Sequence, residues 1–333
     1  MKKILVTGGC GFIGSCFVIK QIQKGNLVVN IDSLTYSGNL ANLEEIKDAK
    51  NYHFIKGDIC DPILSAEILN KFEIDWVVNF AAESHVDNSI STPEVFIKTN
   101  INGTFFLLNN ARHYWQKLSG EKKENFRFLH ISTDEVYGSL LESDPKFNEE
   151  NPYKPNSPYS ASKAASDHLV RAWHHTYQFP TITTNCSNNF GPRQHQEKLI
   201  PTIISACLQD KKIPIYGSGK NIRDWIFVGD HCDGVELALE KGKLGETYCF
   251  GGDAEMQNIE IAKMICEILN RLKPRADKKS YAEQITFVND RAGHDWRYAI
   301  DNKKARNELG FSLSKNFSER LEETVLWYLS KTN

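Results

Sequence analysis

The 333-residue sequence contains no apolar run long enough to cross a membrane, no CxxC pair, no internal repeat and no large excess of charge of one sign. Its 40 Lys and Arg residues nearly balance 42 Asp and Glu residues, which gives no electrostatic reason to expect a nucleic-acid or membrane partner. The eight cysteines are scattered through apolar segments, which favours buried free thiols over a disulfide framework or a metal site. The chain opens on a strand pattern rather than a signal peptide, so we expect a globular cytoplasmic protein without a metal.

A glycine-rich turn follows the first predicted strand, residues 3–7. Gly8, Gly11 and Gly14 stand directly before an apolar pattern of helical period. In a dinucleotide-binding turn, the first glycine permits the tight turn, the second lets a pyrophosphate approach the backbone, and the third lets the helix pack closely. The N–H groups at the start of the helix would then face the phosphates.

A second predicted strand, residues 27–31, ends in Asp32. This carboxylate follows the last glycine by roughly the 20 residues at which an acidic side chain accepts hydrogen bonds from the adenosine ribose. It would repel a 2′-phosphate, so the sequence favours NAD over NADP. The alternative role of Asp32 is a turn or helix cap.

Further strands are predicted at 52–55 and 75–80, each followed by a polar turn and a helical pattern. Repeated βα units imply a parallel sheet that binds its ligands at the carboxyl ends of the strands. Asp58, Ala81 and Ala82 follow those ends and are candidate cofactor contacts. Asp58 could instead cap the helix after it, so both interpretations stay open.

Residues 128–163 carry the clearest chemistry. Thr133, Asp134 and Glu135 follow an apolar strand pattern, and a later helical pattern carries Tyr159 and Lys163. Tyr and Lys at i and i+4 share one helical face, which predicts that the lysine ammonium lies near the tyrosine phenol. Because a nearby positive charge favours the phenolate, the pKa of the tyrosine should be lowered. Such a phenol can act as a general base on a substrate hydroxyl. A solvated Tyr/Lys pair is the alternative, and the glycine turn and acidic strand end favour the catalytic role.

In the second half of the chain, strand and helix patterns alternate less regularly. A strand is predicted at 181–186, a short helix at 201–208 and an edge strand at 213–217. Arginines bracketed by aromatic residues occur at 222–225 and 291–298. They suit a phosphorylated ligand with a flat base or, alternatively, surface salt bridges beside packed aromatics.

Motifs along nearly the whole chain resemble those of the extended short-chain dehydrogenase/reductases and, more narrowly, of the dTDP-glucose 4,6-dehydratases. The matching segments are TGGCGFIG (7–14), DSLTYSGN (32–39), AAESHVDNSI (81–90), STDEVYG (132–138), YSASKAASDHLVRAW (159–173), NCSNNFGP (185–192), EKLIP (197–201), PIYGSG (214–219), RDW (223–225) and AGHDWRYAID (292–301). The Thr-Asp-Glu sequence discriminates most, because related epimerases and reductases lack that acidic pair.

The resemblance implies a redox-neutral reaction of a nucleotide-activated hexose with NAD as the cofactor. Tyr159 would take the proton of the sugar 4-hydroxyl, with Thr133 and Lys163 tuning the phenol. Glu135 would remove the C5 proton while Asp134 protonates the departing 6-hydroxyl.

The resemblance also implies contact residues and an assembly. Those lining the cofactor would include Phe12, Ile13, Asp32, Ser33, Leu34, Thr35, Asp58, Ile59, Thr99 and Asn189. Those holding the nucleotide sugar would be Ser84, Thr133, Asn188, Lys198, Leu199, Pro214, Tyr216, Arg223, Asn258, Arg291 and Asp295. Family members pair through two long helices, here predicted at 94–117 and 159–177, so a homodimer is expected.

Together these patterns predict an α/β fold, a Rossmann-type doubly wound parallel sheet with a smaller C-terminal substrate-binding domain. Residues 1–180 would form the NAD-binding domain, with later segments returning to it. Residues 181–333 would mainly form the nucleotide-sugar-binding domain.

Selectivity and reaction type leave alternatives. Residues 191–198 read GPRQHQEK, where many relatives have an aromatic after Gly-Pro and an aromatic-proline pair before Glu-Lys. Dehydration of UDP-glucose or UDP-N-acetylglucosamine therefore stays open. A sugar-nucleotide 4-epimerase would need only Thr133, Tyr159 and Lys163, and a non-catalytic nucleotide-sugar or NAD sensor would be expected to lose Tyr159 or Lys163.

Overall fold

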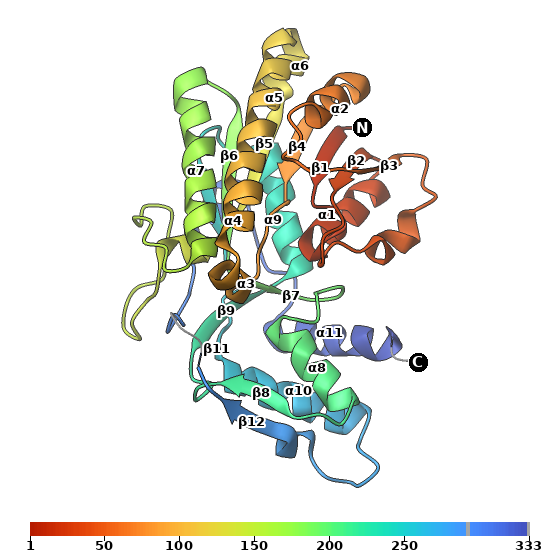
Figure 1. Cartoon of the computed structure of the whole chain (residues 1–333), viewed down its shortest axis with the longest axis vertical. Coiled ribbons are helices and arrows are strands. Elements are labelled where there is room, and N and C mark those ends of the chain that lie inside the picture. Colours follow the sequence, from red (N-terminus) through yellow and green to blue (C-terminus); the bar gives the residue numbers. More distant parts are fainter. Residues whose placement is uncertain (291–293, 332–333) are drawn as a thin grey trace.

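A seven-stranded parallel sheet forms the larger lobe of the molecule (Figure 1), in a computed structural model that describes residues 1–290 and 294–331. Its strand order is β10-β6-β5-β4-β1-β2-β3, with every neighbouring pair parallel. The strands are β1 (Lys3–Thr7), β2 (Leu27–Asp32), β3 (Tyr52–Lys56), β4 (Trp76–Asn79), β5 (Arg127–Thr133), β6 (Thr181–Cys186) and β10 (Thr247–Phe250). The order reverses between β1 and β4, so the predicted doubly wound α/β fold is confirmed.

Helices cover both faces of this sheet, and side-chain alternation along the strands explains why. On β1, Ile4 and Val6 enter the core shared with α1 and α9, whereas Leu5 enters the core shared with α2, α5 and α7. Because both faces are buried, the strands read as nearly continuous apolar runs. The helices are α1 (Phe12–Gln23), α2 (Leu64–Phe72), α5 (Thr104–Lys117), α7 (Pro158–Tyr177) and α9 (Val228–Lys241).

The smaller lobe lies below the sheet in Figure 1. It contains a three-stranded sheet of β7 (Asn188–Phe190), β9 (Ile222–Phe227) and β11 (Glu255–Gln257), and a parallel pair of β8 (Ile213–Tyr216) and β12 (Ile285–Val288). Its core is built mainly by α8 (Leu199–Leu208), α10 (Asn258–Leu272) and α11 (Phe317–Lys331). Strands β6 and β10, although they come after residue 180, belong to the large sheet.

Several short elements complete the described chain. The helices are α3 (Val86–Ser91), α4 (Pro93–Phe96) and α6 (Gly120–Asn125), and the 3₁₀ or π segments are η1 (Leu40–Ile46), η2 (Ile97–Gly103), η3 (Asp134–Tyr137), η4 (Tyr281–Gln284) and η5 (Ala305–Leu309). The helix predicted at 94–117 is therefore a succession of α4, η2 and α5. Its middle is a π-helix, a feature often found at functional sites.

Helix α7 starts at a well-defined amino-terminal cap. The Ser157 hydroxyl accepts a hydrogen bond from Ser160 N at 3.0 Å, the Ser160 hydroxyl accepts one from Ser157 N at 3.0 Å, and Pro158 takes the first helical position. This cap fixes the first turn of the helix, which carries Tyr159.

The remaining expectations from composition concern thiols and membranes. Six of the eight free cysteines are buried, and Cys16 and Cys60 are partly exposed. Among the described residues, no helix combines the length and apolar character needed to cross a membrane, and no three His, Cys, Asp or Glu side chains are grouped as a metal site.

Candidate active site

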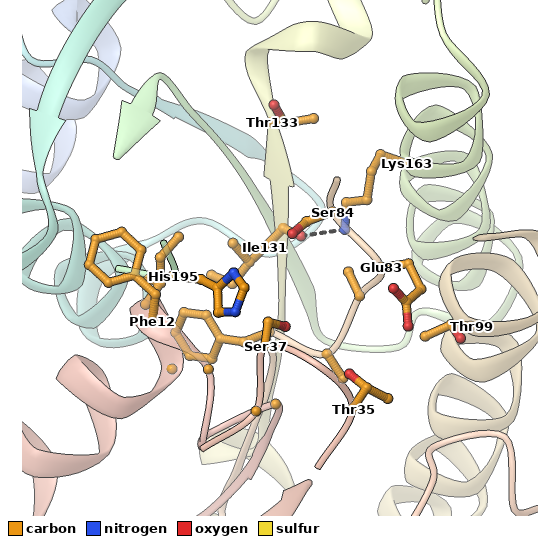
Figure 2. Close-up of a pocket in the computed structure, with 18 of the residues that line it drawn as sticks. Phe12, Thr35, Ser37, Glu83, Ser84, Thr99, Ile131, Thr133, Lys163 and His195 are labelled. Atoms are coloured by element: carbon orange, nitrogen blue, oxygen red, sulfur yellow. Dashed lines mark hydrogen bonds between the residues drawn. The ribbon is translucent and has the colours of Figure 1, made fainter. Parts of the chain in front are cut away.

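One cavity of about 470 Å³ lies at the carboxyl ends of the parallel strands and gathers most of the predicted site residues. This volume is within the usual range for a small-molecule site. Figure 2 shows Phe12, Ser37 and His195 on one side of the cavity, and Thr99, Glu83 and Lys163 on the other. The predicted residues in its lining are Gly8, Gly11, Phe12, Ile13, Gly14, Asp32, Ser33, Thr35, Asp58, Ile59, Ala81, Ala82, Ser84, Thr99, Thr133, Asp134, Glu135, Tyr159, Lys163, Asn188, Asn189 and Lys198.

The glycine turn has the geometry of a phosphate cradle. Gly8 has a φ of +70°, and a Cβ there would lie 2.7 Å from Ala81 N. A Cβ on Gly14 would lie 2.3 Å from Gly8 O, so only glycine lets α1 pack this closely on the turn. Gly11 caps α1 without a side-chain hydrogen bond, which leaves the first N–H groups of the helix available to an anion.

Asp32 holds the loop that borders the ribose end of this cradle. Its Oδ2 accepts a hydrogen bond from Cys10 N at 2.8 Å and its Oδ1 accepts one from Leu34 N at 2.8 Å. Burial raises the pKa of Asp32, an effect that these two backbone donors oppose. Each carboxylate oxygen keeps a second lone pair for a ribose hydroxyl, so the residues fit the predicted dinucleotide. Leu34 is the one predicted cofactor contact that is absent from the cavity lining.

The two interpretations of Asp58 can now be separated. Its Oδ1 accepts a hydrogen bond from Cys60 N at 2.9 Å within a turn. At the start of α2 the acceptor is Asp61 Oδ1, which receives Ile63 N at 2.8 Å and Leu64 N at 3.2 Å. The helix-cap alternative for Asp58 is therefore wrong, and Asp58 lies in the cavity lining.

The acidic pair lies where β5 gives way to the 3₁₀ helix η3. The Thr133 hydroxyl accepts a hydrogen bond from Glu135 N at 3.3 Å and so caps this turn. Because the strand ends there, Asp134 and Glu135 no longer have to point to opposite faces, and both line the cavity.

Asp134 is 2 % exposed, and its Oδ2 has no hydrogen-bond partner among the described residues. Burial raises the pKa of Asp134 well above its ordinary value, and the charges of Glu135 and Asp224 raise it further. A protonated, proton-donating carboxyl group is thus favoured at this position.

Tyr159 and Lys163 both reach the cavity, but the predicted effect of the lysine on the phenol is wrong for this structure. Lys163 Nζ donates a hydrogen bond to Ile131 O at 2.7 Å (Figure 2) and lies 3.3 Å from His130 Nε2. Burial raises the pKa of Tyr159 well above its ordinary value, Glu135 raises it further, and a hydrogen bond from Thr133 opposes the shift. Helical spacing places the ammonium and the phenol on one face of α7, but the ammonium donates its hydrogen bond to a carbonyl of strand β5.

Predicted sugar contacts divide into two groups. Ser84, Thr133, Asn188 and Lys198 are in the cavity lining, and Lys198 Nζ donates to Ser84 O at 3.2 Å. The residues outside the lining are Leu199, Pro214, Tyr216, Arg223, Asn258 and Asp295. Arg291 lies outside the described residues.

Within the second group, Arg223 and Asp295 are in direct contact. Arg223 Nη2 donates to Asp295 O at 3.0 Å, and the guanidinium lies 4.4 Å from the centroid of the Tyr298 ring. Asp295 Oδ1 accepts a hydrogen bond from Asn156 at 2.7 Å. These contacts place a buried arginine and an aromatic ring together on the smaller lobe.

The cavity also contains lining residues that sequence reasoning missed. They include Ser37, Gly38, Glu83, Lys98, Ser132, Ser187, Gln194, His195 and Glu197. Ser37 and Gly38 continue the segment that starts at Asp32, so their sequence position was an available signal. Lys98 lies on the π-helix, for which the sequence period provides no signal.

The divergent loop 191–198 crosses to the loop after β2. The Tyr36 hydroxyl donates to Glu197 Oε1 at 3.3 Å, and the Tyr36 and His195 rings meet edge to face with centroids 5.5 Å apart. Arg193 Nη2 lies 3.1 Å from Glu45 Oε1. The loop thereby borders the cavity on the side opposite α7.

These features define a class: a Rossmann-type dinucleotide-binding protein whose cavity combines a Tyr–Lys pair with an acidic turn at a strand end. The chain matches the family model described as GDP-mannose 4,6 dehydratase over residues 5–324. A dTDP-glucose 4,6-dehydratase of Xanthomonas campestris pv. campestris (strain B100) is 53% identical over 330 residues, covering 99% of this chain and 94% of the relative.

Two solved structures support the same family assignment. The dTDP-glucose 4,6-dehydratase of Bacillus anthracis, in complex with NAD, is 42% identical with a TM-score of 0.87 and covers 99% of this chain and 97% of its own. The Streptomyces venezuelae enzyme of the same name, with NAD and TDP bound, is 41% identical with a TM-score of 0.89, covering 98% and 97%. The protein belongs to the dTDP-glucose 4,6-dehydratase family.

Proposed function

We propose that this protein is an NAD-dependent hydro-lyase that converts dTDP-glucose into dTDP-4-keto-6-deoxyglucose and water. The observation that carries the proposal is the turn at the end of β5, which brings Asp134 and Glu135 into the same cavity as Tyr159 and Lys163. The Tyr–Lys pair alone serves oxidation at C4, whereas eliminating water across C5–C6 needs a base at one carbon and an acid at the other. The names of the relatives support the same activity.

The glycine turn and Asp32 would hold NAD, with the pyrophosphate on the amino terminus of α1 and the ribose on the carboxylate. NAD bound here supplies a hydride acceptor for C4 and a donor for C6, and the positive charge of its oxidised ring favours a nearby phenolate. Asp32 would disfavour NADP, because a 2′-phosphate would meet its negative charge.

Tyr159 would be the base that accepts the proton of the sugar 4-hydroxyl. Its buried phenol is hard to ionise in the protein alone, although the hydrogen bond from Thr133 opposes the rise in its pKa. Lys163, which lines the same cavity, would add its charge once the cavity is filled. Oxidation at C4 forms a ketone, which acidifies the C5 proton.

Glu135 would take the C5 proton, and Asp134 would donate a proton to the 6-hydroxyl as it leaves as water. The raised pKa of Asp134 supports this division of roles, because a buried carboxyl group that keeps its proton can act as the acid. The hydride returned to C6 balances the oxidation at C4. Glu135, after exchanging its proton with solvent, would return a proton to C5, and the proton that Tyr159 took from the 4-hydroxyl would replace the one that Asp134 gave to water.

The nucleotide sugar would lie between the cavity and the smaller lobe. Near the sugar we propose Ser84, Thr133, Asn188 and Lys198, and toward the nucleotide Leu199, Pro214, Tyr216, Arg223, Asn258, Arg291 and Asp295. The guanidinium of Arg223 can pair with a phosphate, and Tyr216 offers a ring for the base.

A panel of nucleotide sugars tests the proposal. The purified protein is incubated with NAD and with dTDP-glucose, UDP-glucose or UDP-N-acetylglucosamine, and product masses are recorded. Loss of one water from dTDP-glucose is the expected result. Loss of water from a UDP-sugar alone would transfer the proposal to that substrate, and an isomer of unchanged mass would establish a 4-epimerase instead.

We also propose a homodimer formed through the helices at 94–117 and 159–177. In Figure 1, α5 and α7 lie side by side at one edge of the large lobe. They and η2 expose apolar side chains, among them Ile97, Phe105 and Tyr177. A sedimentation experiment should give the mass of two chains, and Phe105→Glu should shift it toward one.

A cytoplasmic location completes the proposal. All eight cysteines are free, which suits a reducing compartment. Fractionation of the source cells, followed by detection of the protein in each fraction, tests this location.

A further inference from the structure

A buried polar cluster lies directly behind the candidate active site, between β5 and α7. Its centre is His130, which is 1 % exposed on β5. Its Nε2 lies 3.3 Å from Lys163 Nζ, 3.4 Å from Asp167 Oδ1 and 3.2 Å from the Ser166 hydroxyl. One imidazole nitrogen therefore separates a buried ammonium from a buried carboxylate.

The hydrogen bonds around the ring fix its proton. Asn79 Oδ1 accepts the Thr7 hydroxyl at 2.6 Å, so the Asn79 amide nitrogen faces His130 Nδ1 at 3.1 Å as a donor. Nδ1 is then the acceptor and Nε2 carries the proton of the neutral ring. Burial and the Lys163 charge lower the pKa of His130 to about 4, which keeps the ring neutral.

Asp167 is oriented toward this ring on one side and anchored on the other. Its Oδ2 accepts hydrogen bonds from the Ser132 hydroxyl at 2.7 Å and from the Tyr153 hydroxyl at 3.0 Å. Its Oδ1 is buried and faces His130 Nε2 at 3.4 Å. Ser132 precedes Thr133, so the same carboxylate also contacts the strand end that carries the acidic pair.

We propose that Asp167, acting across the neutral His130 ring, is the counter-charge that keeps the Lys163 ammonium protonated and directed at the Ile131 carbonyl. Asp167 and His130 are thus positioning residues for the proposed reaction. Lys163 is 4 % exposed, and a buried ammonium without a nearby carboxylate loses its proton readily. The catalytic role of Asp167 and His130 rests on the proposed function, whereas the charge interaction between Asp167 and Lys163 rests on these contacts alone.

Among the described residues, several charged or titratable groups surround Lys163. They are His130 on β5, Asp167 on α7 and Cys186 on β6, and Tyr159 on α7 lines the same cavity. Burial lowers the pKa of Lys163 to about 8, and the charge of Asp167 opposes this shift more than Cys186 does. Removing the Asp167 charge should therefore lower the pKa of Lys163 further.

The full-length protein is acetylated competitively at a series of pH values, without NAD or sugar, and is then digested. Mass spectrometry of the peptide that carries Lys163 measures the pKa of its ammonium directly. Asp167→Asn should move the labelling midpoint down by at least ~1 pH unit, the usual effect of losing an opposite charge. Asp167→Glu should return it toward the unmodified protein. Asp230→Asn, which neutralises another buried acid on α9, is the matched control and should leave the midpoint unchanged.

A second measurement needs no variant, in case Asp167→Asn fails to fold. In ¹⁵N spectra of the unmodified protein, the His130 ring resonances should shift with the same midpoint as Lys163 labelling while the ring stays neutral. A His130 ring that does not respond to that titration, or an Asp167→Asn midpoint equal to that of the unmodified protein, overturns the inference.

The catalytic consequence separates this inference from the proposed function. With dTDP-glucose and NAD, Asp167→Asn should shift the alkaline limb of the rate of C4 oxidation to lower pH, by the same amount as the labelling midpoint. If the unmodified protein dehydrates dTDP-glucose but the alkaline limb of the rate does not move in Asp167→Asn, the inference is contradicted and the proposed function is not. A labelling shift in a protein that dehydrates no nucleotide sugar contradicts the proposed function alone.

Discussion

The large parallel sheet and the smaller lobe place their predicted site residues differently. In the large lobe, residues at or just after the carboxyl ends of β1, β2, β4 and β5 meet in one cavity although they are far apart in the chain. In the smaller lobe, Tyr216, Arg223 and Asp295 lie outside that cavity and contact their own neighbours. The carboxyl ends of parallel strands converge because of the sheet topology, whereas no such constraint directs Tyr216 on β8 or Arg223 on β9 toward the cavity.

The comparison predicts that changes in the large lobe affect chemistry and cofactor binding, and that changes at Tyr216, Arg223 and Asp295, which lie outside the cavity, affect only sugar affinity. The largest effect should come from Tyr159→Phe, which removes the titratable phenol and keeps the ring. We expect turnover to fall by roughly 10²–10⁴-fold, the usual loss for a general base. Turnover is measured with dTDP-glucose, and circular dichroism should show an unchanged fold. Full activity in this variant would mean that another group is the base.

Asp32→Ala should have the next largest effect, on cofactor choice. Removing the carboxylate removes a repulsion of about 1–4 kcal/mol against a 2′-phosphate, which corresponds to a change of roughly 5- to 1,000-fold in the preference for NAD over NADP. Calorimetric titration of the stripped protein with both cofactors measures it. Equal affinities already in the unmodified protein would contradict the role of Asp32.

Tyr216→Ala tests the smaller lobe. The ring is 45 % exposed, so its removal should leave stability nearly unchanged. We expect KM for the nucleotide sugar to rise by roughly 2- to 12-fold, the equivalent of the 0.5–1.5 kcal/mol of an aromatic contact, with kcat and NAD affinity unchanged. A fall in NAD affinity would remove the distinction between the lobes.

The smallest effect should come from Arg193→Ala in the loop 191–198. The Arg193–Glu45 pair links this loop to the cofactor side of the cavity, but Glu45 is half exposed, and such pairs contribute about 0.2–1 kcal/mol. NAD should therefore dissociate at most ~5-fold faster, as measured by exchange with labelled NAD. Glu45→Ala should act equally, and the double variant should add nothing further. Additive losses would show that the pair does not act as a unit.

Much of the large lobe could be predicted from the sequence, because the apolar strand runs and the residues that follow them are local signals. Gly8, Gly14 and Asp32 could be assigned in this way, since their spacing reflects the turn and the strand after it. The turn at Thr133 follows a strand whose length the sequence leaves open, so the joint placement of Asp134 and Glu135 needed the structure.

Other features depend on contacts between distant segments. The i, i+4 spacing of Tyr159 and Lys163 describes one helix face but says nothing of the Ile131 carbonyl that takes the ammonium. The π-helix changes the helical period, so pattern analysis alone does not find Lys98, whereas Thr99 was named through the family resemblance. The contact of Tyr36 with Glu197 joins two loops whose paths are set by the packing of the two lobes.

The central claim is that the acidic turn converts an oxidising site into a dehydrating one, and Glu135→Gln tests it most directly. The variant keeps the size of the side chain and removes the base, so oxidation at C4 should proceed while elimination stops. With dTDP-glucose and NAD in deuterated water, we predict that the absorbance of NADH rises and persists, that deuterium enters C5 far more slowly than with the unmodified protein, and that little 4-keto-6-deoxy product is released. Product formation and deuterium incorporation at the unmodified rate would contradict the claim.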